Sequence, residues 1–154
     1  MYRLIGWIVL AGWLNCGVAG NNLLFRDTAG HTVNLTPLKN QWIIIHYWAA
    51  WCPSCIEEIP ELNQFDQHHD KNVLLYGVNY DKLPLPELKH AIIHSHIEFP
   101  ILTTDPGETL QLEEVAVLPL TFIINPYGQV VKKIEGPNTE ASLRETLHAL
   151  QASA

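Results

Sequence analysis

Apolar and polar residues are distributed along the chain in patterns that predict alternating strands and helices. Residues 42–48 form a nearly unbroken apolar run rich in β-branched and aromatic side chains, which is typical of a strand buried on both faces. Residues 73–80 form a second run of this kind. Between the two runs the pattern becomes helical from Pro53 onward. The apolar positions of this predicted helix are Ile56, Ile59, Leu62 and Phe65.

Two hairpins are predicted, one near each end of the chain. Residues 23–26 and 31–35 flank a glycine-containing turn at 27–30. Residues 120–125 and 129–135 are extended runs joined by an Asn-Pro-Tyr-Gly turn, so they should pair as antiparallel strands.

The remaining segments complete an α/β pattern. Asn138 or Thr139 can cap a final helix that reaches about Leu150. Helices that alternate with buried strands and end in a hairpin predict a mixed sheet covered on both faces. Three shorter segments are expected as well: a helix at 85–95, a strand at 99–103 and a short helix at 108–114.

Composition indicates one soluble globular domain. A chain of 154 residues with 47% hydrophobic and 16% charged residues suits a single compact domain. The net charge of −7 arises from 16 acidic and 9 basic residues, and the basic residues form no cluster. Nucleic acid is therefore not expected as a partner.

The first twenty residues have the features of an export signal. Arg3 precedes an apolar run at 4–19, and small residues at 17–20 offer a cleavage site. An uncleaved membrane anchor is the alternative, although the run is shorter than the roughly 20 residues that span a bilayer. Lipidation of Cys16 fits poorly, because the preceding Trp-Leu-Asn lacks the small residues that usually come before a lipidated cysteine.

The expected organisation is thus a signal at 1–20 and a domain at 21–154. The mature protein would be periplasmic or otherwise exported, with anchoring by the N-terminal segment as the alternative. Cleavage would leave Cys52 and Cys55 as the two cysteines, in a compartment where disulfides persist.

The motif Cys52-Pro53-Ser54-Cys55 is the strongest candidate for chemistry. A cysteine attacks as the thiolate, and a helix N-terminus stabilises that anion. Cys52 stands where the predicted strand ends and the helix begins, and proline is well tolerated at the first helical position. We therefore expect Cys52 to attack a substrate disulfide and Cys55 to resolve the mixed disulfide.

Two other uses of a CxxC pair fit less well. A zinc site needs two further ligands, and neither a second cysteine pair nor a well-spaced histidine pair is present. A purely structural disulfide across two residues would constrain little of the unfolded chain.

Several segments resemble one known family. They are the hairpin at 23–35, the block Tyr-Trp-Ala-Ala-Trp-Cys-Pro-Ser-Cys at 47–55, the run at 76–80, and Leu-Pro-Leu-Thr-Phe-Ile-Ile-Asn at 118–125. In this combination the chain resembles the thioredoxin-like family, in particular exported thiol-disulfide oxidoreductases of the TlpA, ResA and CcmG type. The resemblance implies an α/β thioredoxin-like fold, with a central mixed β-sheet flanked by helices and an N-terminal β-hairpin.

The resemblance also implies further site residues. Pro119 matches the family's cis-proline beside the dithiol, with Leu118 as its backbone partner; a strand-starting proline is the simpler interpretation. Trp51, Pro53 and Leu118 are the expected substrate-binding residues. Pro60 resembles a helix-kinking proline and is interpreted as structural.

Glu58 and His46 are candidates for proton transfer. Glu58 follows Cys55 by one helical turn, where such reductases carry a glutamate that helps to deprotonate the resolving cysteine; the alternative is a solvated helix acid. His46 departs from the family pattern of an acid or asparagine. It is a candidate for proton movement near Cys55, or simply a hydrogen-bonded buried histidine.

No metal site is predicted. His90, His94 and His96 have a spacing that invites comparison with copper or zinc sites, but histidines on a surface helix are usually solvated. Copper carriers of this fold use a CxxxC pair instead. No cofactor is expected, and the redox-active group is the Cys52-Cys55 disulfide.

The expected function is an exported reductase of protein disulfides, either general or specific to cytochrome c maturation. Its partners would be protein thiol or disulfide substrates and a membrane thiol electron donor of the DsbD or CcdA type. The alternatives are a disulfide oxidase or isomerase and a non-enzymatic metal-binding module. Reduction potential, substrate identity and oligomeric state do not follow from the sequence.

Overall fold

The computed structural model describes residues 23–36 and 41–153. The export signal expected at 1–20, Cys16 included, lies outside these residues. The main sheet has four strands in the order β4-β3-β5-β6, in which β4 is parallel to β3 while β5 and β6 are antiparallel to their neighbours. The strand bounds are β3 Trp42–Trp48, β4 Val73–Asn79, β5 Leu120–Ile124 and β6 Val130–Glu135.

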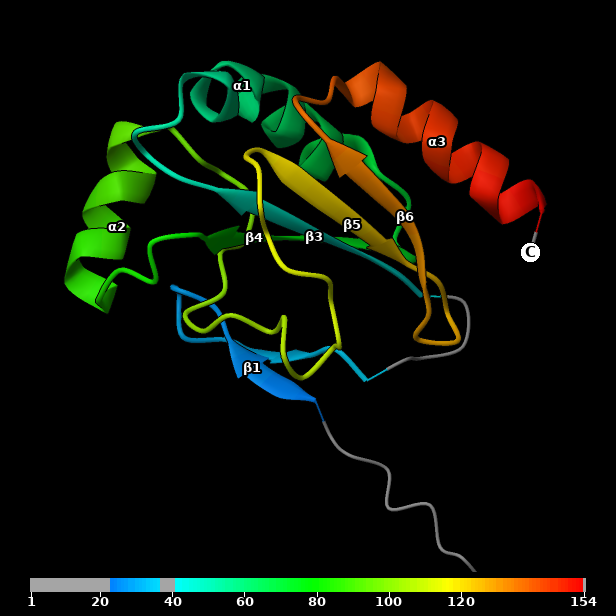
Figure 1. The fold of residues 1–154 in the computed structure, drawn as a ribbon, viewed down its shortest axis with the longest axis horizontal. Coiled ribbons are helices and arrows are strands. Elements are labelled where there is room, and N and C mark those ends of the chain that lie inside the picture. Colours follow the sequence, from blue (N-terminus) through cyan, green and yellow to red (C-terminus); the bar gives the residue numbers. More distant parts are fainter. Residues whose placement is uncertain (1–22, 37–40, 154) are drawn as a thin grey trace, which may run out of the picture.

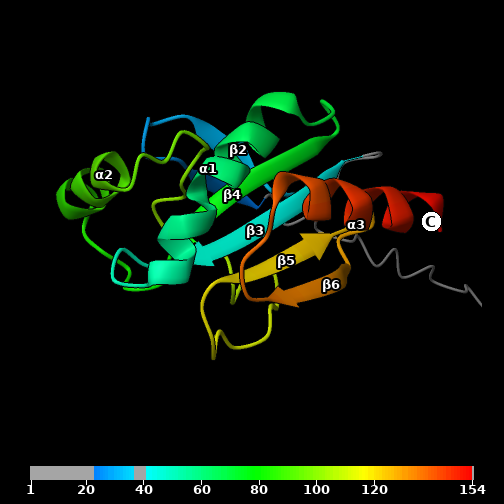
Figure 2. The ribbon, with the colours of Figure 1, turned by 90° about the horizontal axis from the view of Figure 1, so that it is seen from above.

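Helices and a hairpin cover the two faces of this sheet. Helices α1 (Pro53–His68) and α3 (Glu140–Ala152) lie side by side over one face, which we call the helix face (Figure 1). The hairpin of β1 (Leu24–Arg26) and β2 (Thr32–Asn34) lies across the opposite face, the hairpin face. Helix α2 (Leu85–His94) flanks α1 at one end of the sheet (Figure 2). Within the described residues, no helix has the length and apolarity needed to cross a membrane.

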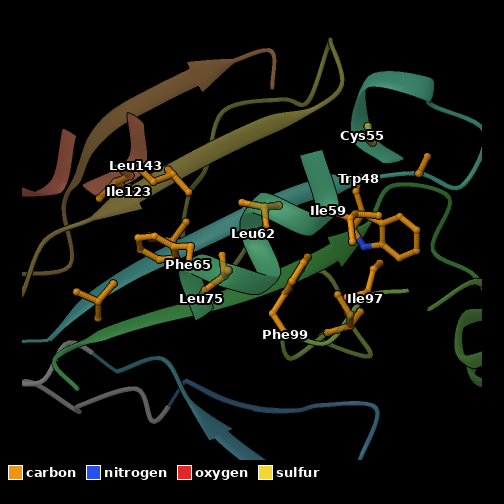
Figure 3. Packing of buried hydrophobic residues seen from close by; sticks show 14 of the residues in the cluster. Trp48, Cys55, Ile59, Leu62, Phe65, Leu75, Ile97, Phe99, Ile123 and Leu143 are labelled. Carbon is orange, nitrogen blue, oxygen red and sulfur yellow. The ribbon is translucent and has the colours of Figure 1, made fainter. Parts of the chain in front are cut away.

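Strand alternation divides the core into two layers. All seven residues of β3 are buried, and successive side chains point to opposite faces. Figure 3 shows the layer under the helices, where Trp48 of β3 lies beside Ile59 of α1, and where Leu62 and Phe65 continue the same layer away from Trp48. The layer under the hairpin contains Ile43, Ile45, Tyr47, Leu120 and Phe122.

The prediction of a regular strand at 99–103 is wrong. Residues Ile101 and Leu102 form two isolated bridges, to Gly77 of β4 and to Asp27 of the hairpin. Pro100 has no N–H to contribute to a ladder. The segment instead links β4 to the hairpin, and a Cβ at Gly77 would collide with the side chains of Ile101 and Phe99.

The predicted helix at 108–114 is absent, because the segment forms a turn at 107–111. Its backbone N–H groups at Leu110, Gln111 and Leu112 donate to carbonyls four, three and five residues earlier, respectively, so no regular helical spacing is repeated. Gln111 then adopts a positive φ of 53°, which ends any helical continuation.

The other elements agree with the predictions to within a few residues. Thr139 caps α3 in a capping box with Ser142, as one of the two expected capping residues. Asn138, the other candidate, is instead buried and makes contacts described below. Helix α1 continues through Pro60.

Candidate active site

The dithiol lies at the junction between β3 and α1. Cys52 is the N-cap residue of α1, with extended backbone angles, and Pro53 occupies the first turn. Cys52 and Cys55 are joined by a disulfide. Cys52 is 5% exposed and Cys55 is fully buried at 0%, so the first cysteine lies nearer to solvent.

The surroundings of the Cys52 sulfur suit a thiolate. The backbone N–H of Cys55 donates a hydrogen bond to Cys52 Sγ at 3.3 Å, and Ser54 Oγ lies 3.5 Å from the same sulfur. No acidic residue stands in the first turn of α1 to offset the positive end of the helix dipole. Helix geometry therefore favours negative charge on Cys52 once the disulfide opens.

Trp51 forms an exposed rim beside the dithiol. Trp51 is 63% exposed, and its Nε1–H donates to both carboxylate oxygens of Asp81, at 3.0 and 2.9 Å. Tyr80 packs edge-on against the same ring. Pro53 is also exposed. An exposed aromatic ring held in place by neighbours is suited to contact a partner molecule.

The Leu118–Pro119 peptide bond is cis and directly precedes β5. Leu120 of β5 pairs with Tyr47 of β3, so Pro119 lies toward the carboxyl end of β3, after which Cys52 follows. Pro119 is buried, and its carbonyl accepts a hydrogen bond from Gly136 N–H at 2.9 Å. Leu118 is half-buried and packs against both core layers.

Glu58 and His46 lie together in the buried interior beneath α1. Glu58 Oε1 is 3.3 Å from His46 Nε2, and each side chain is 1% exposed. Among the described residues, neither of these two buried atoms has a hydrogen-bond partner, so the contact between them is electrostatic. Glu58 Oε2 accepts a 2.7 Å hydrogen bond from the backbone N–H of Asn138. The alternative interpretation of Glu58 as a solvated helix acid is therefore wrong.

Burial shifts the pKa values of this pair in opposite directions. Loss of hydration raises the pKa of Glu58 to about 7, although hydrogen bonds from Asn138 oppose that rise. The same loss of hydration lowers the pKa of His46 to about 3. Near neutral pH the histidine is thus neutral, while the carboxyl group is poised to gain or lose a proton.

Thr121 and Asn138 complete this polar cluster and were not predicted as site residues. His46 Nδ1 lies 3.0 Å from Thr121 Oγ1, and Asn138 Nδ2 donates to that same oxygen at 3.1 Å. In the sequence, the signal for Thr121 was its polar side chain inside the apolar run at 120–125. The strand register then places Thr121 directly opposite His46.

The surface histidines do not join this site. His90 and His94 are exposed neighbours on α2, with their Nε2 atoms 3.0 Å apart, and His96 follows the helix with a positive φ of 55°. Across residues 23–36 and 41–153, no three His, Cys, Asp or Glu side chains gather closely enough to hold a metal ion.

A dithiol at the start of α1, on a mixed four-stranded sheet with an added hairpin, places the protein among the thioredoxin-like thiol-disulfide oxidoreductases. The sequence pattern of the AhpC/TSA family matches residues 18–133. The chain therefore belongs to the AhpC/TSA family.

Individual relatives agree with this assignment. Thiol-disulfide oxidoreductase ResA of Bacillus subtilis is 29% identical over 132 residues, covering 84% of this chain and 73% of that protein. Sporulation thiol-disulfide oxidoreductase A of Bacillus subtilis is 30% identical over 128 residues, covering 79% of this chain and 75% of that protein. The crystal structure of StoA from Bacillus subtilis superposes with a TM-score of 0.68 at 30% identity, over 79% of this chain and 92% of that chain. The thioredoxin-like fold and the oxidoreductase class predicted from the sequence are confirmed.

Proposed function

We propose that the protein is an exported reductase that opens disulfides in protein substrates. The observation that carries the proposal is the position of Cys52, whose sulfur caps α1 and receives the Cys55 N–H. A thiolate at this place is stabilised before any substrate arrives, and it is the attacking species in disulfide exchange.

The reaction begins with the reduced dithiol. The Cys52 thiolate attacks one sulfur of a substrate disulfide, forming a mixed disulfide and expelling the other substrate sulfur as a thiolate. Cys55 then loses its proton and attacks Cys52 Sγ, which releases the second substrate sulfur. The substrate gains two electrons and two protons as thiols, and the enzyme is left with the Cys52–Cys55 disulfide.

Glu58 is the proposed acceptor for the proton of Cys55. It is buried one turn along α1, and the raised pKa near 7 allows the group to take up and release protons at neutral pH. Cys55 is fully buried, so its proton needs an acceptor inside the protein. His46 contacts Glu58 and is the second group proposed to take part in proton transfer.

Substrate contact is proposed for the rim around the dithiol. Trp51 and Pro53 are exposed beside Cys52, and half-buried Leu118 with the adjoining cis-Pro119 lies near the end of β3. Leu118 would offer its backbone to an extended substrate segment, and Trp51 would offer an aromatic surface.

The cellular setting is proposed from the sequence. The N-terminal segment would direct export to the periplasm or its equivalent and leave open whether the domain stays anchored. Oxidised protein would regain electrons from a membrane thiol donor of the DsbD or CcdA type. Apocytochrome c is the proposed substrate for a maturation role.

The reduction potential of the Cys52/Cys55 couple tests the direction of electron flow. Equilibration of the domain with defined dithiol buffers should give a value at or below roughly −230 mV for a reductase, whereas a value near about −120 mV would indicate an oxidant. The absence of a reversible couple would contradict both directions.

Exchange of single cysteines tests the proposed division of labour. Cys52→Ser should abolish reduction of a protein disulfide, because the attacking thiolate is lost. Cys55→Ser should instead accumulate a mixed disulfide through Cys52, visible as a reductant-sensitive adduct on a gel. Accumulation through Cys55 in the Cys52→Ser protein would contradict these roles.

A further inference from the structure

The polar cluster on the helix face joins four elements in one closed ring. His46 comes from β3, Glu58 from α1, Thr121 from β5, and Asn138 from the segment that leads into α3. The four residues are between 0% and 4% exposed. Buried polar groups are costly unless they are paired, so a ring of this kind needs an explanation beyond packing.

We assign His46 the tautomer that makes the donors of this ring run in one direction. The amide of Asn138 donates to Thr121 Oγ1, so the hydroxyl hydrogen of Thr121 points away from that amide. His46 Nδ1, at 3.0 Å, is an acceptor within its reach. A histidine that accepts at Nδ1 carries its proton at Nε2, which faces Glu58 Oε1 at 3.3 Å.

Asn138 closes the ring from its other end. Its backbone N–H donates to Glu58 Oε2 at 2.7 Å, while Glu58 Oε1 makes the 3.3 Å contact with His46 Nε2. Consecutive hydrogen bonds in a dry interior strengthen one another, and donors that face a carboxylate favour its ionised form.

We propose that His46, oriented by Thr121 and Asn138, is a positioning residue that holds the Glu58 carboxyl group in place and favours its ionised form, so that it can accept the proton of Cys55. The proposal rests on the proposed reductase function. It assigns new roles to Thr121 and Asn138, and it gives His46 an indirect role through Glu58.

The proton step is balanced within the site. The proton of the Cys55 thiol passes to the Glu58 carboxylate, and the resulting thiolate attacks Cys52 Sγ. The bond between Cys52 and the substrate sulfur breaks, and that sulfur leaves with the electron pair. Glu58 later returns its proton to solvent or to the departing thiolate.

Few titratable or charged groups face Glu58 and His46. From α1 the dithiol lies one turn before Glu58, and from β3 the facing group is His46 itself. Thr121 of β5 and Asn138 are uncharged. Phe99 presents its ring edge-to-face against His46.

Glu61 offers a matched comparison for a merely structural role. It lies one turn after Glu58 on α1, and its Oε2 accepts the backbone N–H of Glu140 at 2.9 Å. Both acids therefore anchor the start of α3 to α1. Among the described residues, Glu58 contacts a histidine and Glu61 does not. Glu61→Gln thus removes a carboxylate at the start of α3, while keeping an acceptor oxygen, without touching the ring.

The experiment follows the two steps of exchange separately, with Ellman's reagent as the disulfide. The reduced protein releases a first thionitrobenzoate when Cys52 attacks, at a rate proportional to reagent concentration. Attack by Cys55 on the resulting mixed disulfide releases a second, at a rate independent of concentration. The pH dependence of the second phase reports removal of the Cys55 proton.

The expected changes fall on the second phase. Glu58→Gln should slow it strongly, by roughly 100-fold or more at neutral pH, as for loss of a general base. His46→Leu should raise the pH midpoint and slow the phase roughly 10- to 100-fold at neutral pH, because it removes the polar contact to the carboxylate. Thr121→Val should slow the phase about 3- to 10-fold, because it removes the buried hydrogen bond that orients His46. His46→Gln, which keeps an N–H donor, should restore part of the rate.

The controls separate positioning from general destabilisation. Glu61→Gln and Ile123→Val, the latter on the same strand and face as Thr121, should leave the pH midpoint of the second phase unchanged. Equal midpoints in wild type, His46→Leu and Thr121→Val would overturn the proposal while leaving the dithiol chemistry intact. Absence of the first phase in the wild-type protein would instead contradict the proposed function.

Discussion

The two faces of the central sheet are built from the same strands but differ in polarity. On the hairpin face, Phe122 and its neighbours form an apolar layer. On the helix face, one residue away along β5, Thr121 belongs to a buried polar ring that includes Glu58. Both faces are equally dry, since Thr121 and Phe122 are each 0% exposed.

This difference indicates that the two faces contribute differently to stability and to function. Apolar burial stabilises without demanding particular partners, whereas buried polar groups lose hydration and regain it only through specific hydrogen bonds. The polar ring lies on the face that carries α1, and hence the dithiol. We infer that the hairpin face stabilises the sheet and that the helix face also tunes the chemistry.

The largest predicted effect compares adjacent residues of β5. Phe122→Ala should lower the free energy of unfolding by about 3–5 kcal/mol, because it opens a cavity in a close-packed layer. Thr121→Val should lower it by only about 1–3 kcal/mol, through the loss of one buried hydrogen-bonding group. Urea denaturation measures both changes. A larger loss for Thr121→Val than for Phe122→Ala would show that the polar ring is the main structural support.

The next effect concerns stability against pH. Burial raises the pKa of Glu58 from 4.5 to about 7, so the folded state holds this proton more tightly than the unfolded chain. The associated stability is fully present below pH 4.5 and is lost as the pH rises through 7. Between pH 5 and pH 9, the free energy of unfolding of the wild-type protein should fall by on the order of 3 kcal/mol more than that of Glu58→Gln.

Denaturation midpoints across this pH range test that expectation. Glu61→Gln is the control, and its curve should run parallel to that of the wild type. Parallel curves for Glu58→Gln and wild type would mean that Glu58 ionises in the fold as easily as in the unfolded chain, and that the two faces do not differ in this respect.

The smallest predicted effect compares the two faces of the sheet at apolar positions only. Ile44 and Ile45 are adjacent on β3, are both 0% exposed, and point to the helix face and the hairpin face respectively. Ile44→Val and Ile45→Val should each lower the free energy of unfolding by about 0.5–1.5 kcal/mol. Similar losses in urea denaturation would place the difference between the faces in their polar groups, and a loss confined to one variant would place it in packing.

The elements built on local patterns could be predicted from the sequence. The apolar run at 42–48, the helix that starts at Pro53 and the Thr139 cap depend on periodicity and capping among near neighbours in the chain. The dithiol was recognisable for the same reason, because its chemistry depends on a four-residue spacing at a helix start.

Segments governed by distant contacts were predicted poorly. Residues 99–103 and 108–114 have apolar content compatible with a strand and a helix, yet isolated bridges to β4 and the hairpin determine the path of the first. In the second, a turn and the positive φ of Gln111 replace the expected helix. Local propensity is too weak to decide such short segments.

The sequence by itself determined the order of the longer strands and helices, the position of Cys52 at a helix start and the separation of Cys55 by one turn. The tertiary structure alone decided that Glu58 is buried, that it faces His46, and that Thr121 and Asn138 complete the ring. These contacts join residues between 12 and 80 positions apart, as in the 80-residue separation of Glu58 and Asn138. Strand register and helix packing set such contacts, and the burial that they create is what shifts the proton affinity of Glu58.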